Sequence, residues 1–270
     1  MNELRQIPLF VGMFAAFSML VGAEDGLSLV PQRKHALLIG YSDYSRQPLF
    51  ESLPSASNDI SALRKRLQGI GFVVDVLNER NAPDRQKLVA ETGKWITQSA
   101  DSDFCLIYYS GHAAQRDFSS FLVPPTGTIR YREDLDGAGV GLDWIMRTLQ
   151  RTTKGAAVVM LDGCRTGLPP RPDPAQIRVN RIVPFRTSYR EREYFVVYAT
   201  EAGTIAGDHH PDNPKNSLFT WSFVQQLDKG KGKTFEQLLR GTKSAVLEAS
   251  EGRQSPDAKG LLSHEYILSP

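Results

Sequence analysis

Two reactive side chains follow apolar runs of this sequence. His112 comes shortly after residues 103–110 (DFCLIYYS), and Cys164 shortly after residues 156–161 (AAVVML). A cysteine attacks as its thiolate, and a neighbouring imidazole can take the thiol proton and later return it to a leaving amine. We therefore predict a Cys-His dyad in which Cys164 is the nucleophile and His112 is the base.

The segments around these two residues alternate between predicted strands and helices. Each main strand is a continuous apolar run, which is typical of a parallel sheet that is buried on both faces. The sequence predicts strands over residues 35–40, 72–77, 103–110, 156–161, 194–200 and 265–268, with a short edge or hairpin strand at 121–124. It predicts helices over 84–99, 143–150, 217–227 and 234–250, and another that starts at the capping residues 57–59. We expect an α/β fold with a mostly parallel central sheet and helices on both faces.

Ligands of open α/β sheets bind beyond the carboxyl ends of the strands. His112 and Cys164 both fall there, so two neighbouring strands would bring them side by side. The backbone N–H groups of Ala113 and Cys164 are the candidate donors to a tetrahedral oxyanion.

Other residues of reactive type have simpler interpretations. Cys105 lies in the middle of a predicted strand and is interpreted as a core residue. His209 and His210 are adjacent on a predicted loop, so they point apart and cannot easily share a metal ion; we expect a solvated loop. Residues 133–136 hold three acids without the ligand spacing of a calcium loop, which favours a surface acidic cluster. We predict no metal and no cofactor.

The composition excludes several classes of protein. The 270-residue chain has 32 basic and 30 acidic residues, and a net charge of +2 gives no electrostatic reason to expect a nucleic-acid partner. Hydrophobic residues make up 41% of the chain, which is enough for a sizeable core. Two cysteines exclude a disulfide-stapled scaffold and a four-thiolate zinc site within one chain.

The segment that precedes the predicted catalytic domain, residues 34–270, differs from that domain in composition. Residues 7–23 (IPLFVGMFAAFSMLVGA) carry no charge and end in small residues, which predicts a signal peptide over 1–23, a linker over 24–33 and an exported, periplasmic or secreted, protein. An uncleaved membrane anchor and an apolar first helix are the alternatives, and only an uncleaved segment would meet a membrane.

A long polar segment interrupts the predicted domain. Residues 165–193 contain five prolines and seven arginines with no apolar period, which predicts a mobile loop.

Two motifs give the chain a resemblance to a known family. Residues 108–112 (YYSGH) and 161–165 (LDGCR) resemble the catalytic histidine and Asp-x-Cys-Arg segments of caspases, metacaspases and bacterial caspase-like peptidases. The histidine lies about 50 residues before the Cys-Arg, as in caspases. Weaker matches occur in the family's order at 37–40, 57–63, 198–203, 216–220 and 254–256, so the likeness runs from about residue 34 to 268. Ala113 is a departure, because most relatives have glycine there.

The resemblance implies a three-layer caspase-like sandwich and a cysteine endopeptidase that acts on proteins or peptides. Caspases carry glutamine two residues before the nucleophile and bind a substrate aspartate with arginines, whereas this chain has Asp162 there. Asp59 matches an Asn-Asp segment that lines the same pocket in metacaspases. A carboxylate pair attracts arginine or lysine and repels aspartate, so cleavage after Arg or Lys is expected. The alternative interpretations are a helix N-cap for Asp59 and a turn residue for Asp162.

Two other functions remain open at the level of sequence. One is a caspase-like interaction scaffold that has lost activity or is catalytically weak. The other is a thiol-dependent hydrolase of small esters or amides.

Overall fold

The computed structural model describes residues 28–116, 119–164, 166–171, 194–201, 203–204 and 206–270. The predicted signal peptide lies outside these residues, and so do residues 24–27 of the predicted linker and residues 165 and 172–193 of the predicted loop. Within the described part of the chain, no helix is long and apolar enough to cross a membrane.

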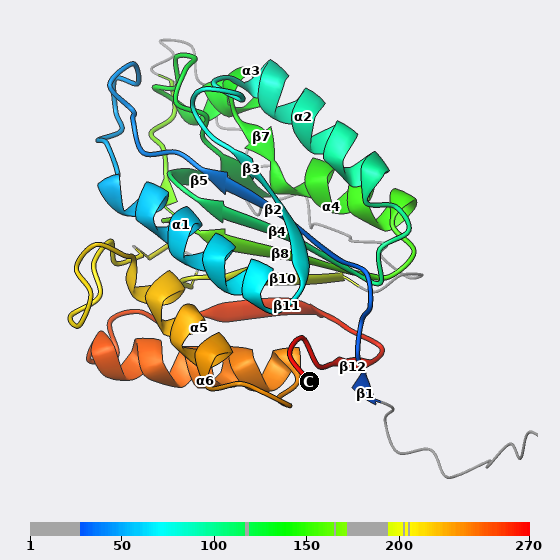
Figure 1. Cartoon of the computed structure of the whole chain (residues 1–270). Coiled ribbons are helices and arrows are strands. Elements are labelled where there is room, and N and C mark those ends of the chain that lie inside the picture. Colours follow the sequence, from blue (N-terminus) through cyan, green and yellow to red (C-terminus); the bar gives the residue numbers. More distant parts are fainter. Residues whose placement is uncertain (1–27, 117–118, 165, 172–193, 202, 205) are drawn as a thin grey trace, which may run out of the picture.

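Among the described residues, the central sheet has six strands in the order β11-β10-β8-β4-β2-β3. Every neighbouring pair is parallel except β10 and β11, which are antiparallel. The bounds are β2 Lys34–Gly40, β3 Phe72–Leu77, β4 Phe104–Ser110, β8 Ala156–Asp162, β10 Tyr194–Tyr198 and β11 Asp257–Leu261. The prediction of a mostly parallel central sheet is therefore confirmed (Figure 1).

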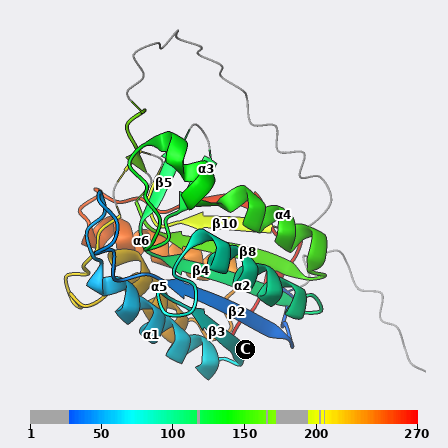
Figure 2. The ribbon, with the colours of Figure 1, turned by 90° about the horizontal axis from the view of Figure 1, so that it is seen from above.

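Helices cover both faces of this sheet, as Figures 1 and 2 show. On one face lie α1 Pro54–Gly69, α5 Leu218–Asp228 and α6 Phe235–Ala249; on the other lie α2 Arg85–Gln98, α3 Leu135–Ala138 and α4 Leu142–Thr152. Alternate residues of each strand enter the two cores, because side chains of a strand point to opposite faces. In β8, for example, Val158 and Met160 pack under α1, α5 and α6, and Val159 and Leu161 pack under α2 and α4.

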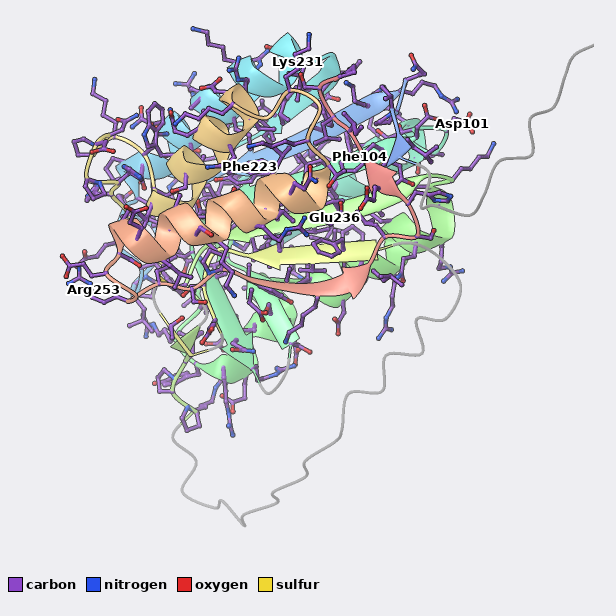
Figure 3. The ribbon with its side chains drawn as sticks, turned by 90° about the horizontal axis from the view of Figure 1, so that it is seen from below. Asp101, Phe104, Phe223, Lys231, Glu236 and Arg253 are labelled. Carbon is purple, nitrogen blue, oxygen red and sulfur yellow. The ribbon has the colours of Figure 1, made fainter. Side chains whose placement is uncertain are left out.

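An aromatic cluster fastens α5 and α6 to the sheet. The Phe104 ring of β4 lies 5.5 Å from that of Phe235, and the Phe223 ring of α5 lies 6.5 Å from it, both edge to face. Figure 3 shows Phe104 and Phe223 between the helices and the strands. Such pairs add to the free energy gained by burying the rings.

Smaller strands complete the molecule. In the part of the chain that the structure describes, a four-stranded sheet has the order β7-β6-β5-β9, and a parallel pair joins β1 to β12 near the two ends. The bounds are β1 Ser28–Leu29, β5 Ala113–Arg116, β6 Ser119–Leu122, β7 Val140–Gly141, β9 Thr166–Gly167 and β12 Glu265–Tyr266, with a 3-10 turn, η1, at Arg132–Asp134. Since β5 starts immediately after His112, the small sheet extends the structure beyond the carboxyl end of β4.

The sequence-based prediction of the first helix was wrong at its start. The helix begins at Pro54 with Leu53 as N-cap, and proline is well suited to the first helical position because it lacks an N–H. Asp59 consequently lies inside α1, so its interpretation as an N-cap is wrong. The strands β5 and β11 were not predicted, because β5 is short and the sequence of β11, DAKGL, is polar and mostly exposed.

Candidate active site

The loops that carry the two predicted catalytic residues touch one another. Ser110 at the end of β4 pairs in register with Asp162 at the end of β8, and the Gly111 N–H donates to the Asp162 carbonyl at 3.2 Å. A Cβ added to Gly163 would lie 2.5 Å from the Gly111 carbonyl oxygen, so only glycine fits this approach without a backbone shift. The prediction that neighbouring strands bring these loops together is confirmed.

His112 is held in one orientation by the loop that precedes α1. Its ring packs against Tyr44 and Phe50, with ring centroids 4.6 and 4.9 Å away. Its Nε2 lies 2.7 Å from the carbonyl oxygen of Glu51. A carbonyl only accepts hydrogen bonds, so Nε2 carries the hydrogen of the neutral ring and Nδ1 is left as the proton acceptor.

Cys164 is half-buried and lies among backbone donors. The backbone N–H groups of Ala206 and of Cys164 itself act to lower the pKa of the thiol, which favours the thiolate. Burial nevertheless raises the pKa of the thiol, and the negative charges of Asp208 and Asp162 raise it further. The other cysteine, Cys105, is buried in β4, and burial raises the pKa of that thiol to about 11, as expected of a core residue.

Burial shifts both residues of the predicted dyad toward their neutral forms. Burial lowers the pKa of His112, against the opposing effects of the Glu51 carbonyl and the charges of Asp208 and Glu51. Both shifts disfavour a thiolate–imidazolium pair. Among the hydrogen bonds of the described residues, none joins His112 to Cys164.

Ala113, the predicted oxyanion donor next to His112, is the first residue of β5 and pairs with Leu122. Its methyl group lies 3.4 Å from the position that a Cβ on Gly163 would occupy. The alanine that departs from the family pattern is therefore accommodated by the absence of a side chain at Gly163. The N–H of Cys164, the second predicted donor, is near its own sulfur.

The two acids predicted to bind substrate are brought together beneath this site. Asp59 is fully buried and Asp162 is 5% exposed. Asp59 accepts hydrogen bonds from Asn216 Nδ2 at 2.8 Å, from the Ser217 N–H at 3.0 Å and from Ser110 Oγ at 3.1 Å. The Oδ2 atom of Asp162 accepts from Ser217 Oγ at 2.5 Å, Thr220 Oγ1 at 2.6 Å and Tyr108 Oη at 3.2 Å.

The proximity of these acids makes their ionisation mutually unfavourable. Burial, together with the charge of Asp162, raises the pKa of Asp59 to about 8, although its three hydrogen-bond donors oppose that shift. Burial also raises the pKa of Asp162, against its three hydroxyl donors. At neutral pH the pair therefore holds a proton, which a bound cation would displace.

Sequence reasoning matched residues 198–203 and 216–220 to family segments, but it missed that the described part of residues 199–217, the facing segment, approaches His112 and Cys164. Asp208 lies near enough for its charge to act on both Cys164 and His112. His210 is buried and accepts the Asp212 N–H on Nδ1 at 3.1 Å, so the prediction of a solvated loop was wrong for His210; His209 is exposed. No periodicity marks this segment, and its contacts arise only when β10 and α5 are placed.

The acidic cluster of residues 133–136 is paired with arginines. Arg116 makes a two-pronged ion pair with Asp136, at 2.6 and 2.7 Å, and Arg171 contacts both Glu133 and Asp134. The cluster therefore anchors Arg171, seven residues after Cys164. In the described residues, no group of three or more His, Cys, Asp or Glu side chains is arranged to hold a metal ion.

Comparisons with known proteins agree with this architecture. Among solved structures, the chain is similar to caspase-1 from Spodoptera frugiperda, with a TM-score of 0.61 and 16% identity over 88% of this chain and 93% of that chain. At that identity the likeness shows the fold, a caspase-like α/β sandwich. No curated protein matches the sequence. The family model of the caspase domain, peptidase C14, matches residues 33–265. The chain therefore belongs to the caspase-domain family of cysteine peptidases.

Proposed function

We propose that this protein is a cysteine endopeptidase that cleaves proteins after arginine or lysine, with Cys164 as nucleophile and His112 as base. The observation that carries the proposal is the contact between the loops after β4 and β8, through Gly111, Asp162 and Gly163. That contact supports a dyad built from residues far apart in the sequence, with a carboxylate pair directly beside it.

In the proposed reaction, Nδ1 of His112 takes the proton of the Cys164 thiol as the sulfur attacks the scissile carbonyl carbon. The C–N bond then breaks, and the amine leaves with the proton from His112. Water attacks the resulting thioester, and the carboxylic acid is released as the thiol is restored. The hydrogen bond between His112 Nε2 and Glu51 supports this role because it leaves Nδ1 as the basic nitrogen.

The carboxylate pair is the basis for the proposed specificity. A guanidinium or ammonium group that reaches Asp59 and Asp162 would displace their shared proton and form charge-assisted hydrogen bonds. A substrate aspartate would add a third negative charge to a buried acidic site. The pair therefore favours Arg or Lys at the residue before the cleaved bond.

The test is a positional-scanning peptide library assayed with the purified protein, three single variants and one double variant. We expect turnover of Arg and Lys substrates by wild type and by Cys105→Ala, none by Cys164→Ala, and a loss of several orders of magnitude in His112→Ala. The Cys164→Ala/His112→Ala double variant should be scarcely worse than either single variant, because the two residues act as a unit. Full activity in Cys164→Ala would refute the assignment.

A caspase-like interaction scaffold is the second candidate function. It is favoured by the electrostatics of the site, because burial raises the pKa of Cys164 and lowers that of His112 and so disfavours a thiolate–imidazolium pair. A correctly folded wild-type protein that turns over no member of the library would support this alternative. Ester turnover without peptide turnover would instead indicate a small-molecule hydrolase.

A further inference from the structure

The side chain of a buried glutamine, Gln254, forms hydrogen bonds with two separate residues of the facing segment, Ala199 and Gly207. Gln254 lies just beyond the end of α6, next to Arg253, which Figure 3 labels, and its side chain is 3% exposed. Its Nε2 donates to the Ala199 carbonyl at 2.8 Å, and its Oε1 accepts the Gly207 N–H, also at 2.8 Å. One planar carboxamide therefore holds both ends of residues 199–207.

The backbone of Gln254 is itself fixed, so the carboxamide is not a mobile contact. Its N–H donates to Ser250 Oγ at 3.0 Å, and the same hydroxyl donates to the Gln254 carbonyl at 3.2 Å. The Gly207 carbonyl accepts the N–H of Leu218, the first residue of α5, at 3.1 Å. A Cβ on Gly207 would lie 3.2 Å from Gln254 Oε1, which shows how closely the two residues approach.

The segment held in this way is tied to β8 at one end and approaches Cys164 at the other. The Ala199 N–H donates to the Leu161 carbonyl of β8, three residues before Cys164, at 2.8 Å. Ala206, directly before Gly207, is buried, and its N–H lies close enough to the Cys164 sulfur to lower the pKa of the thiol. An N–H held against a thiol lowers the free energy of the thiolate more than that of the neutral form.

We propose that Gln254 is a positioning residue for the nucleophile, whose carboxamide holds the Ala206 N–H against Cys164 and thereby stabilises the thiolate. The inference rests on the proposed function, in which that thiolate attacks the substrate. Gln254 acts through the Gly207 peptide and touches neither the sulfur nor a substrate.

The charges around Cys164 stay constant when Gln254 is truncated. Among the described residues, Asp162 at the end of β8 and Asp208 on the facing segment act on the Cys164 thiol through their charges, and His112 on the loop after β4 interacts with Asp208. Because glutamine is neutral, Gln254→Ala removes none of these charges. A change in thiol ionisation would therefore report the position of the Ala206 N–H.

The experiment measures the rate of iodoacetamide labelling of Cys164 against pH, by mass spectrometry of the Cys164 peptide. Gln254→Ala should raise the pH at which the labelling rate is half-maximal, the labelling midpoint, by about one to two pH units. This is the size expected for the loss of one hydrogen bond to an ionised group. Gln254→Glu should also move the midpoint upward, because a carboxylate cannot donate to Ala199 and adds a negative charge. The matched control is Gln237→Ala, which removes another backbone-binding carboxamide, at the start of α6, and should leave the midpoint unchanged.

An unchanged midpoint in folded Gln254→Ala would overturn the inference, as would an equal shift in Gln237→Ala. If Gln254→Ala does not fold, an unchanged midpoint in Gln254→Glu has the same consequence. Labelling needs no substrate, so the outcome is separate from the peptide assay. Absence of peptide turnover would count against the proposed function and leave the labelling result standing.

Discussion

Asp59 and Asp162 share a single residue, Ser217, as hydrogen-bond donor. The Ser217 N–H donates to Oδ1 of Asp59 at 3.0 Å, and its hydroxyl donates to Oδ2 of Asp162 at 2.5 Å. Ser217 is also the N-cap of α5, where its Oγ accepts the Thr220 N–H at 3.0 Å. The start of α5 thus fixes the spacing of the two carboxylates, and both stay buried next to the residues after β4 and β8.

The charge of Asp162 should determine the preference for basic substrates. Asp162→Asn keeps an oxygen that can accept hydrogen bonds from Ser217, Thr220 and Tyr108, but it removes the negative charge. We expect kcat/KM for arginine peptides to fall by a factor equivalent to about 2–4 kcal/mol, and Asp162→Ala should lose at least as much. Asp143→Asn, which changes a partly buried acid on α4, is the control. Preferred cleavage after aspartate by wild type would show that the pocket has been misassigned.

Burial of Asp59 should make the folded protein less stable as pH rises. The pKa of this carboxyl is about 8 in the folded chain and 3.8 ordinarily, so its stabilising proton is fully present below pH 3.8 and is lost as pH rises through 8. The free energy of unfolding, measured with urea, should fall between pH 6 and 8 in wild type. In Asp59→Asn this fall should be smaller by about 1–2 kcal/mol. Asp101→Asn, at an exposed acid whose pKa is lowered by Lys154, should leave that pH dependence unchanged. A parallel pH dependence in wild type and Asp59→Asn would contradict the assignment.

Asp208 should control the pH at which the nucleophile ionises. Its negative charge raises the pKa of both Cys164 and His112, so Asp208→Asn should lower both. The midpoint of iodoacetamide labelling of Cys164 and the acid limb of kcat/KM should consequently move to lower pH. Asp212→Asn, on the same segment but beside His210, serves as the control. An upward shift in Asp208→Asn would reverse the electrostatic argument.

The close approach of Gly163 to Gly111 should make the site intolerant of a side chain there. Gly163→Ala places a carbon 2.5 Å from the Gly111 carbonyl and 3.4 Å from the Ala113 methyl, so we expect at least a tenfold fall in kcat/KM. Ala113→Gly in the same chain should restore part of the activity by letting residues 111–113 shift. Additive losses in a double-mutant cycle would show that the two positions do not interact.

Self-cleavage is expected between the anchored residue Arg171 and β10. Arg171 is bound to Glu133 and Asp134, whereas the rest of the predicted loop, with five of its seven arginines, lies beyond it. Purified wild type should be cut after an arginine in residues 172–193, and Cys164→Ala should remain whole, as intact-mass measurement would reveal. Cutting that persists in Cys164→Ala would identify a different protease as its cause.

The sequence by itself predicted five of the six described strands of the central sheet, all but β11, and singled out the two reactive side chains. Continuous apolar runs ended at Ser110 and near Asp162, and parallel strands place such ends at one edge of a sheet, so the meeting of the His112 and Cys164 loops followed from local pattern. The Asp-x-Cys-Arg motif also directed attention to Asp162. These features are readable because each depends on residues that are close together in the chain.

Only the tertiary structure decided how these residues are supported. The start of α1 at Pro54 buries Asp59 against Ser217, from an element 158 positions later, and sets the pKa of that acid. The Glu51 carbonyl selects the basic nitrogen of His112, and Gln254 holds the segment that reaches Cys164. Backbone carbonyls and N–H groups are the same at every residue, so no sequence pattern marks the ones that matter. Packing of distant elements places them, and burial then shifts the pKa values of the groups they touch.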